Sequence, residues 1–173
     1  MRFCKYNHIY IFMNACYNFV MNYRYATLQD ARELTEAVQN TIRQIYPDFY
    51  CEEIVTAFLE LHCLENITQD IKHGNTIIVK LNGKIAGTGS IEDGRHITRV
   101  YVLPQFQRQG VGCFIMAVLE SKIKANGFEK AILDSSAPAL EFYKKCGYKQ
   151  IETGEYKVTD MTTLYYEIME KSL

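Results

Sequence analysis

One turn near the middle of the chain combines two glycines with three polar side chains, in a pattern suited to binding phosphate. The segment is Gln107-Arg108-Gln109-Gly110-Val111-Gly112, and an apolar helical pattern follows it. Because glycine has no Cβ, backbone N–H groups there can approach a ligand closely. The first N–H groups of a helix have no intrahelical acceptor, and the positive end of the helix dipole favours an anion. Gln107, Arg108 and Gln109 add side-chain donors, and Arg108 also adds a charge.

Two other glycine-rich phosphate motifs fit this turn poorly. A dinucleotide fingerprint requires a third small residue where this chain has Ile115, and a P-loop requires Gly-Lys-Ser/Thr, which the segment lacks. A second interpretation remains open, in which Gly110 and Gly112 only permit a tight turn from a strand into a helix.

The segments around the turn predict a mixed sheet. Asn82-Gly83 and Asp93-Gly94 are tight-turn dipeptides between β-branched and apolar runs, which favours an antiparallel meander of three strands. We expect these strands at residues 76–79, 84–92 and 95–102. A helix from Val111 to Gly127 and a strand at 130–135 follow, and the strand–helix–strand order makes the last two strands parallel.

Helices and strands are also predicted on both sides of this central part. A short strand at 23–26 precedes Thr27, which with Asp30 forms an approximate capping box for a helix over 28–45. Apolar spacing predicts further helices at 51–63, 66–73 and 138–146, and strands at 148–152 and 161–168. The fold class is therefore α+β, with a mixed sheet covered by helices.

Length and composition favour one soluble domain. The chain has 173 residues, is 48% hydrophobic and has a formal net charge of −1, so it lacks the basic excess of a nucleic-acid-binding protein. We expect a single domain over 23–173. Residues 1–22 would be an N-terminal extension, either an added strand or a poorly ordered segment. Asn7, Asn14 and Asn18 interrupt its apolar run, which argues against a signal peptide or a membrane span.

The cysteines and histidines suggest no metal site. Six cysteines are scattered without a Cys-x-x-Cys pair, and the four histidines show no ligand spacing. We therefore expect reduced thiols in a cytoplasmic protein. Cys113 and Cys146 are interpreted as packing residues, because no histidine lies near them in the sequence to act as a base.

Two motifs resemble those of the GNAT superfamily of N-acetyltransferases. Val102-x-Pro104-x-x-Gln107-x-x-Gly110-x-Gly112 is similar to that family's acetyl-CoA motif, Gln/Arg-x-x-Gly-x-Gly/Ala. Ala139 to Tyr148 resembles its second signature, in which an alanine, a Phe-Tyr pair, and a glycine before an aromatic residue occur in that order. The resemblance extends over about residues 23–168. It implies a central, mostly antiparallel twisted sheet flanked by helices, with a V-shaped splay between the strands near 97–102 and 130–135.

The resemblance also implies acetyl-CoA as the acyl donor and a role for each matching residue. Backbone N–H groups from Gln107 to Gly112 would bind the pyrophosphate of coenzyme A. The pantetheine arm would pair with Val100, Tyr101 and Val102, with Ser135 and Ser136 at the mouth of its slot. Tyr143 would protonate the leaving thiolate, although a tyrosine beside Phe142 can also be an ordinary core residue.

The general base is less well defined. A lysine-like amine is neutral in only about one molecule in 2,500 at pH 7, so a base or a water chain would help the reaction. Many relatives have a glutamate where this chain has Thr98. Glu92 and His96 are the candidate replacements, and each could instead be a solvated end of a hairpin. An amine of low pKa would need no base.

The expected reaction transfers an acetyl group to a primary amine of a small molecule or peptide, by direct attack in a ternary complex. Tyr46, Asp48 and Tyr50 form a candidate acceptor-site lid, and Tyr156 is a weaker candidate; a loop packed by aromatic residues is the alternative. Other open hypotheses are a non-catalytic acyl-CoA sensor and a protein-lysine or N-terminal acetyltransferase. No nucleic acid, membrane or metal is expected as a partner, and the protein would be a monomer or homodimer.

Overall fold

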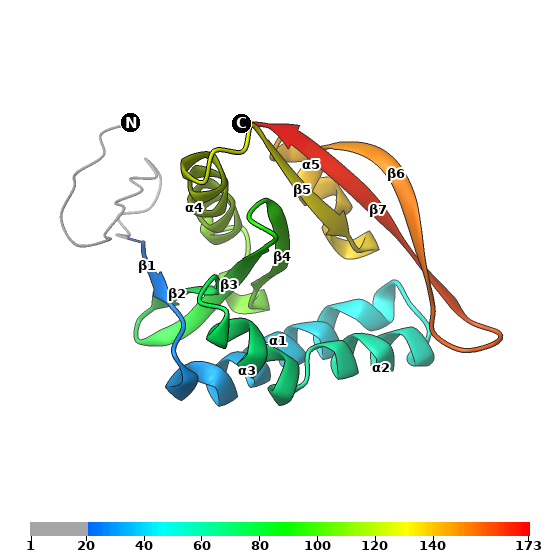
Figure 1. Ribbon diagram of the computed structural model, residues 1–173. Helices are drawn as coiled ribbons and strands as arrows, with labels where there is room; N and C mark the ends of the chain where they lie inside the picture. Colours follow the sequence, from blue (N-terminus) through cyan, green and yellow to red (C-terminus); the bar gives the residue numbers. More distant parts are fainter. Residues whose placement is uncertain (1–20) are drawn as a thin grey trace.

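The computed structural model describes residues 21–173, which fold around one seven-stranded sheet (Figure 1). The strand order is β1-β2-β3-β4-β5-β7-β6. The strands are β1 (Asn22–Tyr25), β2 (Ile77–Leu81), β3 (Lys84–Glu92), β4 (His96–Val102), β5 (Lys130–Ser135), β6 (Lys149–Lys157) and β7 (Thr163–Ser172). Residues 1–20 of the expected N-terminal extension lie outside the described residues, whereas Met21 is buried and Asn22 begins β1.

Among the described residues, five α-helices cover the two faces of the sheet. They are α1 (Ala31–Ile45), α2 (Glu52–Leu61), α3 (Leu64–Lys72), α4 (Val111–Ala125) and α5 (Leu140–Lys145). One core joins α4 and α5 to the sheet, and a second joins α1 and α3 to its other face. Figure 1 shows these two helix groups on opposite sides of the central strands. Within residues 21–173, each helix is too short or too polar to cross a bilayer.

The expected V-shaped splay between β4 and β5 is confirmed. These two strands are the one parallel pair among the strand pairs of the described chain, and their pairing is limited to His96 with Ile132 and Ile97 with Leu133. Beyond Ile97, β4 continues to Val102 alongside β3 alone. The α+β class and the mostly antiparallel sheet are therefore as predicted.

A β-bulge in β4 lies where the two strands separate. Thr88 pairs with Tyr101 and Ser90 pairs with Thr98, so Arg99 and Val100 together face the single residue Gly89. Arg99 adopts a left-handed backbone conformation with φ of 53°. An extra residue bends a strand and increases its twist, which explains why β4 turns away from β5 here.

Two glycines in β3 allow α4 to lie directly against the sheet. A Cβ atom at Gly87 or Gly89 would come within 2.8 Å of the Ile115 side chain. The short distance means that only residues without side chains fit under this part of α4. The close packing determines where the N-terminus of α4 lies relative to the end of β4.

The capping pair before α1 agrees with the sequence expectation, whereas the final hairpin differs from it in length. Asp30 Oδ2 accepts hydrogen bonds from the backbone N–H and the hydroxyl of Thr27, both at 2.8 Å, and Arg24 forms an ion pair with Asp30. The predicted capping pair is therefore present. β6 and β7 begin at Lys149 and Thr163 and end at Lys157 and Ser172, so both end later than the predicted 148–152 and 161–168. Almost every β6 side chain is exposed, so this strand lacks the apolar alternation from which its length could be predicted.

Candidate active site

The turn between β4 and α4 has the backbone geometry of an anion site. Arg108 and Gly110 both adopt left-handed conformations, with φ of 58° and 86°. The first hydrogen bond of the helical type runs from the Phe114 N–H to the Gly110 carbonyl at 2.9 Å. The N–H groups of Val111, Gly112 and Cys113 precede this bond, so they have no helical acceptor. These groups are free to bind an anion at the positive end of the helix dipole.

The glutamines of the turn brace its backbone. Gln107 Nε2 donates to the Val102 carbonyl at 3.0 Å, and Gln109 Nε2 donates to the Gln105 carbonyl at 2.9 Å. Each amide therefore donates to a loop carbonyl, and the expectation that both side chains also offer donors to a ligand stays a prediction. The exposed Arg108 is the cationic side chain of this turn.

Gly112 brings the two sequence motifs into contact. A Cβ atom there would lie 3.0 Å from the Phe142 ring and 3.6 Å from Val102 Cγ2. The first turn of α4 therefore packs closely against α5 and the end of β4. The tight-turn interpretation of the glycines and the anion-site interpretation are compatible, because Gly110 provides the backbone conformation and Gly112 the close approach.

In the described part of the chain, the edge of β4 that faces away from β3 has no partner strand where β4 and β5 separate. The Leu103 N–H donates to the Ala86 carbonyl at 3.0 Å, so strand alternation directs the backbone groups of Val100 and Val102 toward the opening. The Val102 carbonyl accepts a hydrogen bond from Gln107. The N–H group of Val102 is left to bind a ligand. The side chain of Tyr101 is buried on the α1 side of the sheet.

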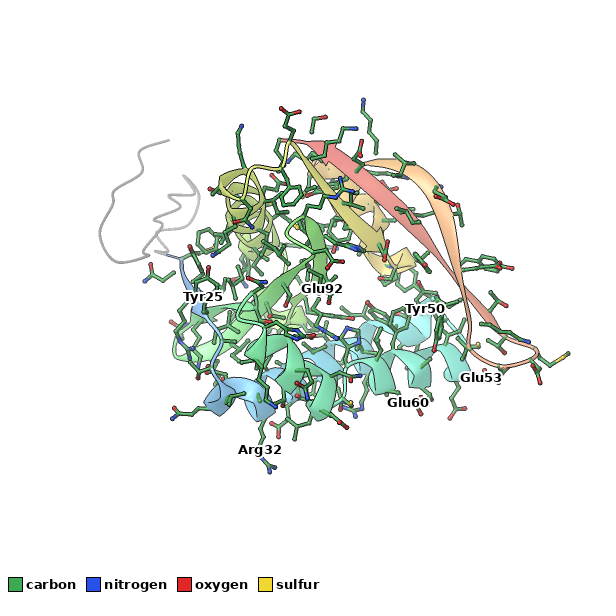
Figure 2. All side chains as sticks on the ribbon, in the orientation of Figure 1. Tyr25, Arg32, Tyr50, Glu53, Glu60 and Glu92 are labelled. Carbon is green, nitrogen blue, oxygen red and sulfur yellow. The ribbon has the colours of Figure 1, made fainter. Side chains whose placement is uncertain are left out.

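Side chains from the α1–α2 connection reach the open end of the splay. The Tyr46 hydroxyl lies 3.4 Å from that of Tyr101 and 3.2 Å from Ser136 Oγ. The Tyr50 hydroxyl accepts a hydrogen bond from the Ala137 N–H at 2.7 Å. Figure 2 shows Tyr50 on the side of the helices that faces the strands. Two of the three predicted lid residues therefore contact the loop after β5, whereas Asp48 is exposed.

His62 is a buried polar residue that the sequence analysis missed. Its Nε2 lies 3.1 Å from the Tyr101 hydroxyl, and its Nδ1 lies 2.8 Å from the Phe58 carbonyl. Burial, reinforced by the positive charge of Arg99, lowers the His62 pKa to about 4. A histidine just after a helix gives no local signal of burial, since its partner Tyr101 is distant in the sequence.

Tyr143 lies in the core beside the rings of Phe142 and Tyr148. The ring centroids are 5.2 Å and 6.0 Å from that of Tyr143. Burial raises the Tyr143 pKa well above its ordinary value, so its phenol keeps its proton at neutral pH. The structure places Tyr143 in the core, and its role as the proton donor to the thiolate stays a prediction.

The two candidate bases lie near the closed end of the splay. Glu92 is exposed at the end of β3 and accepts a hydrogen bond from Thr98 Oγ1 at 3.3 Å. His96 Nε2 lies 3.4 Å from Asp134 Oδ2, and this carboxylate raises the His96 pKa. Figure 2 shows Glu92 apart from Tyr50. Tyr156 is exposed on β6.

The cysteines and acidic residues of the described chain form no obvious reactive centre. Cys51, Cys63, Cys113 and Cys146 are free thiols. Burial is the main cause that raises the Cys146 pKa to about 11, which keeps that thiol protonated. Within residues 21–173, no group of three His, Cys, Asp or Glu side chains could hold a metal ion.

A model of the acetyltransferase (GNAT) domain family matches residues 44–168. The chain belongs to the GNAT acetyltransferase family. The match includes the α1–α2 connection, the splayed strands, the anion turn and α5. Every candidate site residue identified from the sequence lies within this GNAT domain.

Two proteins with similar sequences are acetyltransferases by name. The chain is 32% identical over 111 residues to the uncharacterized N-acetyltransferase YjcF of Bacillus subtilis, which covers 62% of this chain and 75% of that protein. It is 35% identical over 79 residues to the N-terminal acetyltransferase B complex catalytic subunit NAA20 of Arabidopsis thaliana. That second match covers 43% of this chain and less than half, 45%, of the plant protein.

Solved structures of GNAT proteins share the fold. A GCN5-related N-acetyltransferase from Rhodopseudomonas palustris superposes with a TM-score of 0.81 at 26% identity, covering 90% of this chain and 99% of that one. The PaiA N-acetyltransferase of Thermoplasma acidophilum, solved with coenzyme A, has a TM-score of 0.72 at 19% identity over 90% of this chain and 100% of its own. YncA of Salmonella typhimurium, solved with acetyl-CoA, has a TM-score of 0.60 at 18% identity over 88% and 93%.

Proposed function

We propose that this GNAT domain transfers an acetyl group from acetyl-CoA to a primary amine, by direct attack in a ternary complex. The main support is the position of the anion turn at the open end of the splayed strands. There the left-handed Arg108 and Gly110 precede three N–H groups without helical acceptors. The coenzyme complexes of the similarly folded PaiA and YncA proteins support the same ligand.

Each part of this site has a defined task in the proposed reaction. The N–H groups at the start of α4 bind the pyrophosphate, and the backbone of Val100 and Val102 pairs with the pantetheine arm. The amine nitrogen attacks the thioester carbonyl and loses a proton to water, and the carbon–sulfur bond breaks as the carbon–nitrogen bond is completed. The Tyr143 phenol gives its proton to the leaving thiolate and regains one from water.

The N-terminal α-amine of a peptide is a second candidate acceptor, favoured by the absence of a glutamate at Thr98. An α-amine has a pKa near 7.8, so about one molecule in seven is neutral at pH 7, against about one in 2,500 for a lysine. Such a substrate makes little demand on a base, which suits a site with the hydroxyl of Thr98 bonded to Glu92. The similarity to a plant N-terminal acetyltransferase subunit supports this acceptor class.

Calorimetry with coenzyme A tests the anion turn. Gly110→Glu places a carboxylate at the turn and strains its left-handed backbone, so we expect loss of binding by at least about a hundredfold. Gly74→Glu is the matched control, because Gly74 is also left-handed, with φ of 77°, and its Cβ would meet open space. Normal coenzyme binding by Gly110→Glu would refute the site.

Thiol release from acetyl-CoA, measured over a panel of amines and N-terminal peptides, separates an enzyme from a sensor. We expect Tyr143→Phe to lower kcat by about tenfold to a hundredfold while coenzyme affinity is retained. Saturable coenzyme binding by the native protein without turnover of any acceptor would instead favour a non-catalytic acyl-CoA sensor.

A further inference from the structure

A chain of four side-chain groups links the buried His62 to the open end of the splay. His62 contacts the Tyr101 hydroxyl at 3.1 Å, Tyr101 contacts Tyr46 at 3.4 Å, and Tyr46 contacts Ser136 Oγ at 3.2 Å. The groups come from the end of α2, from β4, from the α1–α2 connection and from the loop after β5. His62, Tyr101 and Tyr46 are all buried, so their polar groups depend on one another for hydrogen bonds.

The contacts of His62 determine which group donates in each of these hydrogen bonds. The Phe58 carbonyl, 2.8 Å from Nδ1, can only accept, so Nδ1 must have the hydrogen. The imidazole is neutral because it is buried and lies near the Arg99 guanidinium, which forms an ion pair with Asp70. In this tautomer Nε2 is an acceptor, and the Tyr101 hydroxyl donates to it.

The hydrogen bond from Tyr101 to His62 also fixes the donors in the next two hydrogen bonds. Tyr101 has one hydroxyl hydrogen and uses it on His62, so Tyr46 must donate to Tyr101. Tyr46 then has no hydrogen left for Ser136, and the Ser136 hydroxyl must donate to Tyr46. The lone pairs of Ser136 Oγ remain as acceptors at the mouth of the splay.

The position of Ser136 in the chain would suit a helix-capping role. It occupies the N-cap position of the short Ala137–Ala139 turn, yet its side chain makes no cap hydrogen bond there. The Ala137 N–H instead donates to the Tyr50 hydroxyl at 2.7 Å, so the loop is held by the same α1–α2 connection that supplies Tyr46. The Ser136 hydroxyl therefore forms its hydrogen bond with Tyr46 and does not cap the turn that follows it.

We propose that His62 is a positioning residue that makes the Ser136 hydroxyl a hydrogen-bond acceptor. Ser136 Oγ then accepts a hydrogen bond from an N–H group of the ligand bound between β4 and β5. This N–H group belongs to an amide of the pantetheine arm or to the attacking amine. This inference rests on the proposed acetyl transfer only for the identity of that ligand. If His62 loses its acceptor nitrogen, the buried phenols donate in the opposite direction and Ser136 presents a hydrogen instead.

The tautomer of His62 can be determined by a measurement that does not depend on enzymatic activity. In the ¹⁵N spectrum of the imidazole, we expect the full-length protein at neutral pH to show a protonated Nδ1 and an unprotonated Nε2. A protonated Nε2 would overturn the proposal, because Tyr101 could then not donate to it. This result is independent of whether any amine is a substrate, so it separates failure of this inference from failure of the proposed function.

Three variants test the consequence for the ligand. His62→Leu removes both ring nitrogens, whereas His62→Gln retains an acceptor for Tyr101 and a donor for Phe58. We expect His62→Leu to weaken the affected step about tenfold and His62→Gln to restore most of it. His73→Leu, at an exposed histidine after α3, is the matched control and should change nothing. Equal losses in the Gln and Leu variants would overturn the proposal, and thermal unfolding of each variant identifies any that fails to fold.

Two titrations show which N–H group Ser136 accepts. If it is the pantetheine amide, His62→Leu weakens coenzyme A binding but leaves ADP binding unchanged, because ADP lacks the arm. If it is the amine, coenzyme affinity is unchanged and KM for the amine rises. No change in either quantity overturns the proposal. We also expect Tyr46→Phe to have the same effect as His62→Leu, with the double variant no worse than either single variant, because both act on one chain; additive losses would contradict it.

Discussion

The two sides of the splay are built in opposite ways. On the coenzyme side, residues 103–113 form one continuous segment in which backbone N–H groups would bind the ligand. On the other side, where we propose that the acceptor binds and which we call the acceptor side, side chains from four separate segments meet at Tyr46 and Tyr101. The first arrangement depends on backbone conformation and close approach, and the second depends on hydrogen-bond direction and burial. Changes in glycines should therefore affect the coenzyme side, and changes in polar side chains the acceptor side.

The largest expected effect is acid destabilisation of the acceptor side through His62. Its pKa is about 4 in the folded protein and 6.5 in the unfolded chain. The neutral form is favoured by folding, so this contribution is fully present above pH 6.5 and is lost as pH falls toward 4. The loss in the free energy of unfolding is about 3 kcal/mol in total, with about 2 kcal/mol lost between pH 7 and pH 5.

Urea unfolding at pH 7 and pH 5 measures this term. In His62→Gln the difference between the two pH values should shrink by about 2 kcal/mol relative to the native chain. The exposed His73→Gln serves as the control and should keep the native difference. An unchanged pH dependence in His62→Gln would show that His62 is not buried in its neutral form.

A smaller effect is expected at the contact between α4 and α5 on the coenzyme side. A Cβ atom at Gly112 would lie 3.0 Å from the Phe142 ring, so in Gly112→Ala either this ring or the start of α4 must shift by a few tenths of an ångström. We expect coenzyme A affinity to fall about fivefold, or about 1 kcal/mol, measured by calorimetry. Adding Phe142→Leu removes the obstructing ring edge and should restore affinity. If the double variant binds no better than Gly112→Ala, the effect is not due to this contact.

The smallest effect is expected from Arg108, whose side chain is exposed. Arg108→Gln removes the charge and keeps the ability to donate hydrogen bonds. Coenzyme affinity should fall by about twofold to fivefold at low salt, and the difference should largely disappear near 0.5 M salt, where exposed charges are screened. A large loss that persists at high salt would mean that the side chain binds the phosphates directly, and that the backbone is not the main determinant.

The backbone geometry on the coenzyme side could largely be predicted from the sequence. Gly110, Gly112 and the Phe142-Tyr143 pair lie in short motifs whose local geometry follows from glycine conformation and helix termination. The order of strands and helices predicted the parallel pair of β4 and β5, and the family resemblance predicted its splay. The contacts of Gln107 and Gln109 were not predicted, because their amides donate to the carbonyls of Val102 and Gln105 within the loop.

The acceptor side could be predicted only in outline. Tyr46 and Tyr50 were identified as candidates, but their contacts with Ser136 and Ala137 were not. The candidate bases Glu92 and His96 are near the closed end of the splay, where Thr98 and Asp134 are their partners. His62 gave no signal at all, since nothing around it in the chain indicates that it is buried.

The sequence by itself determined the backbone site, because the conformations of neighbouring residues suffice to orient successive N–H groups at a helix start. Only the tertiary structure decided the side-chain network, because Tyr101 and His62 are 39 positions apart and meet through the packing of helices on the sheet. The bulge at Arg99, which turns β4 away from β5, also depends on its pairing with β3. Hydrogen-bond direction is a property of the assembled groups, so no single segment of the chain specifies it.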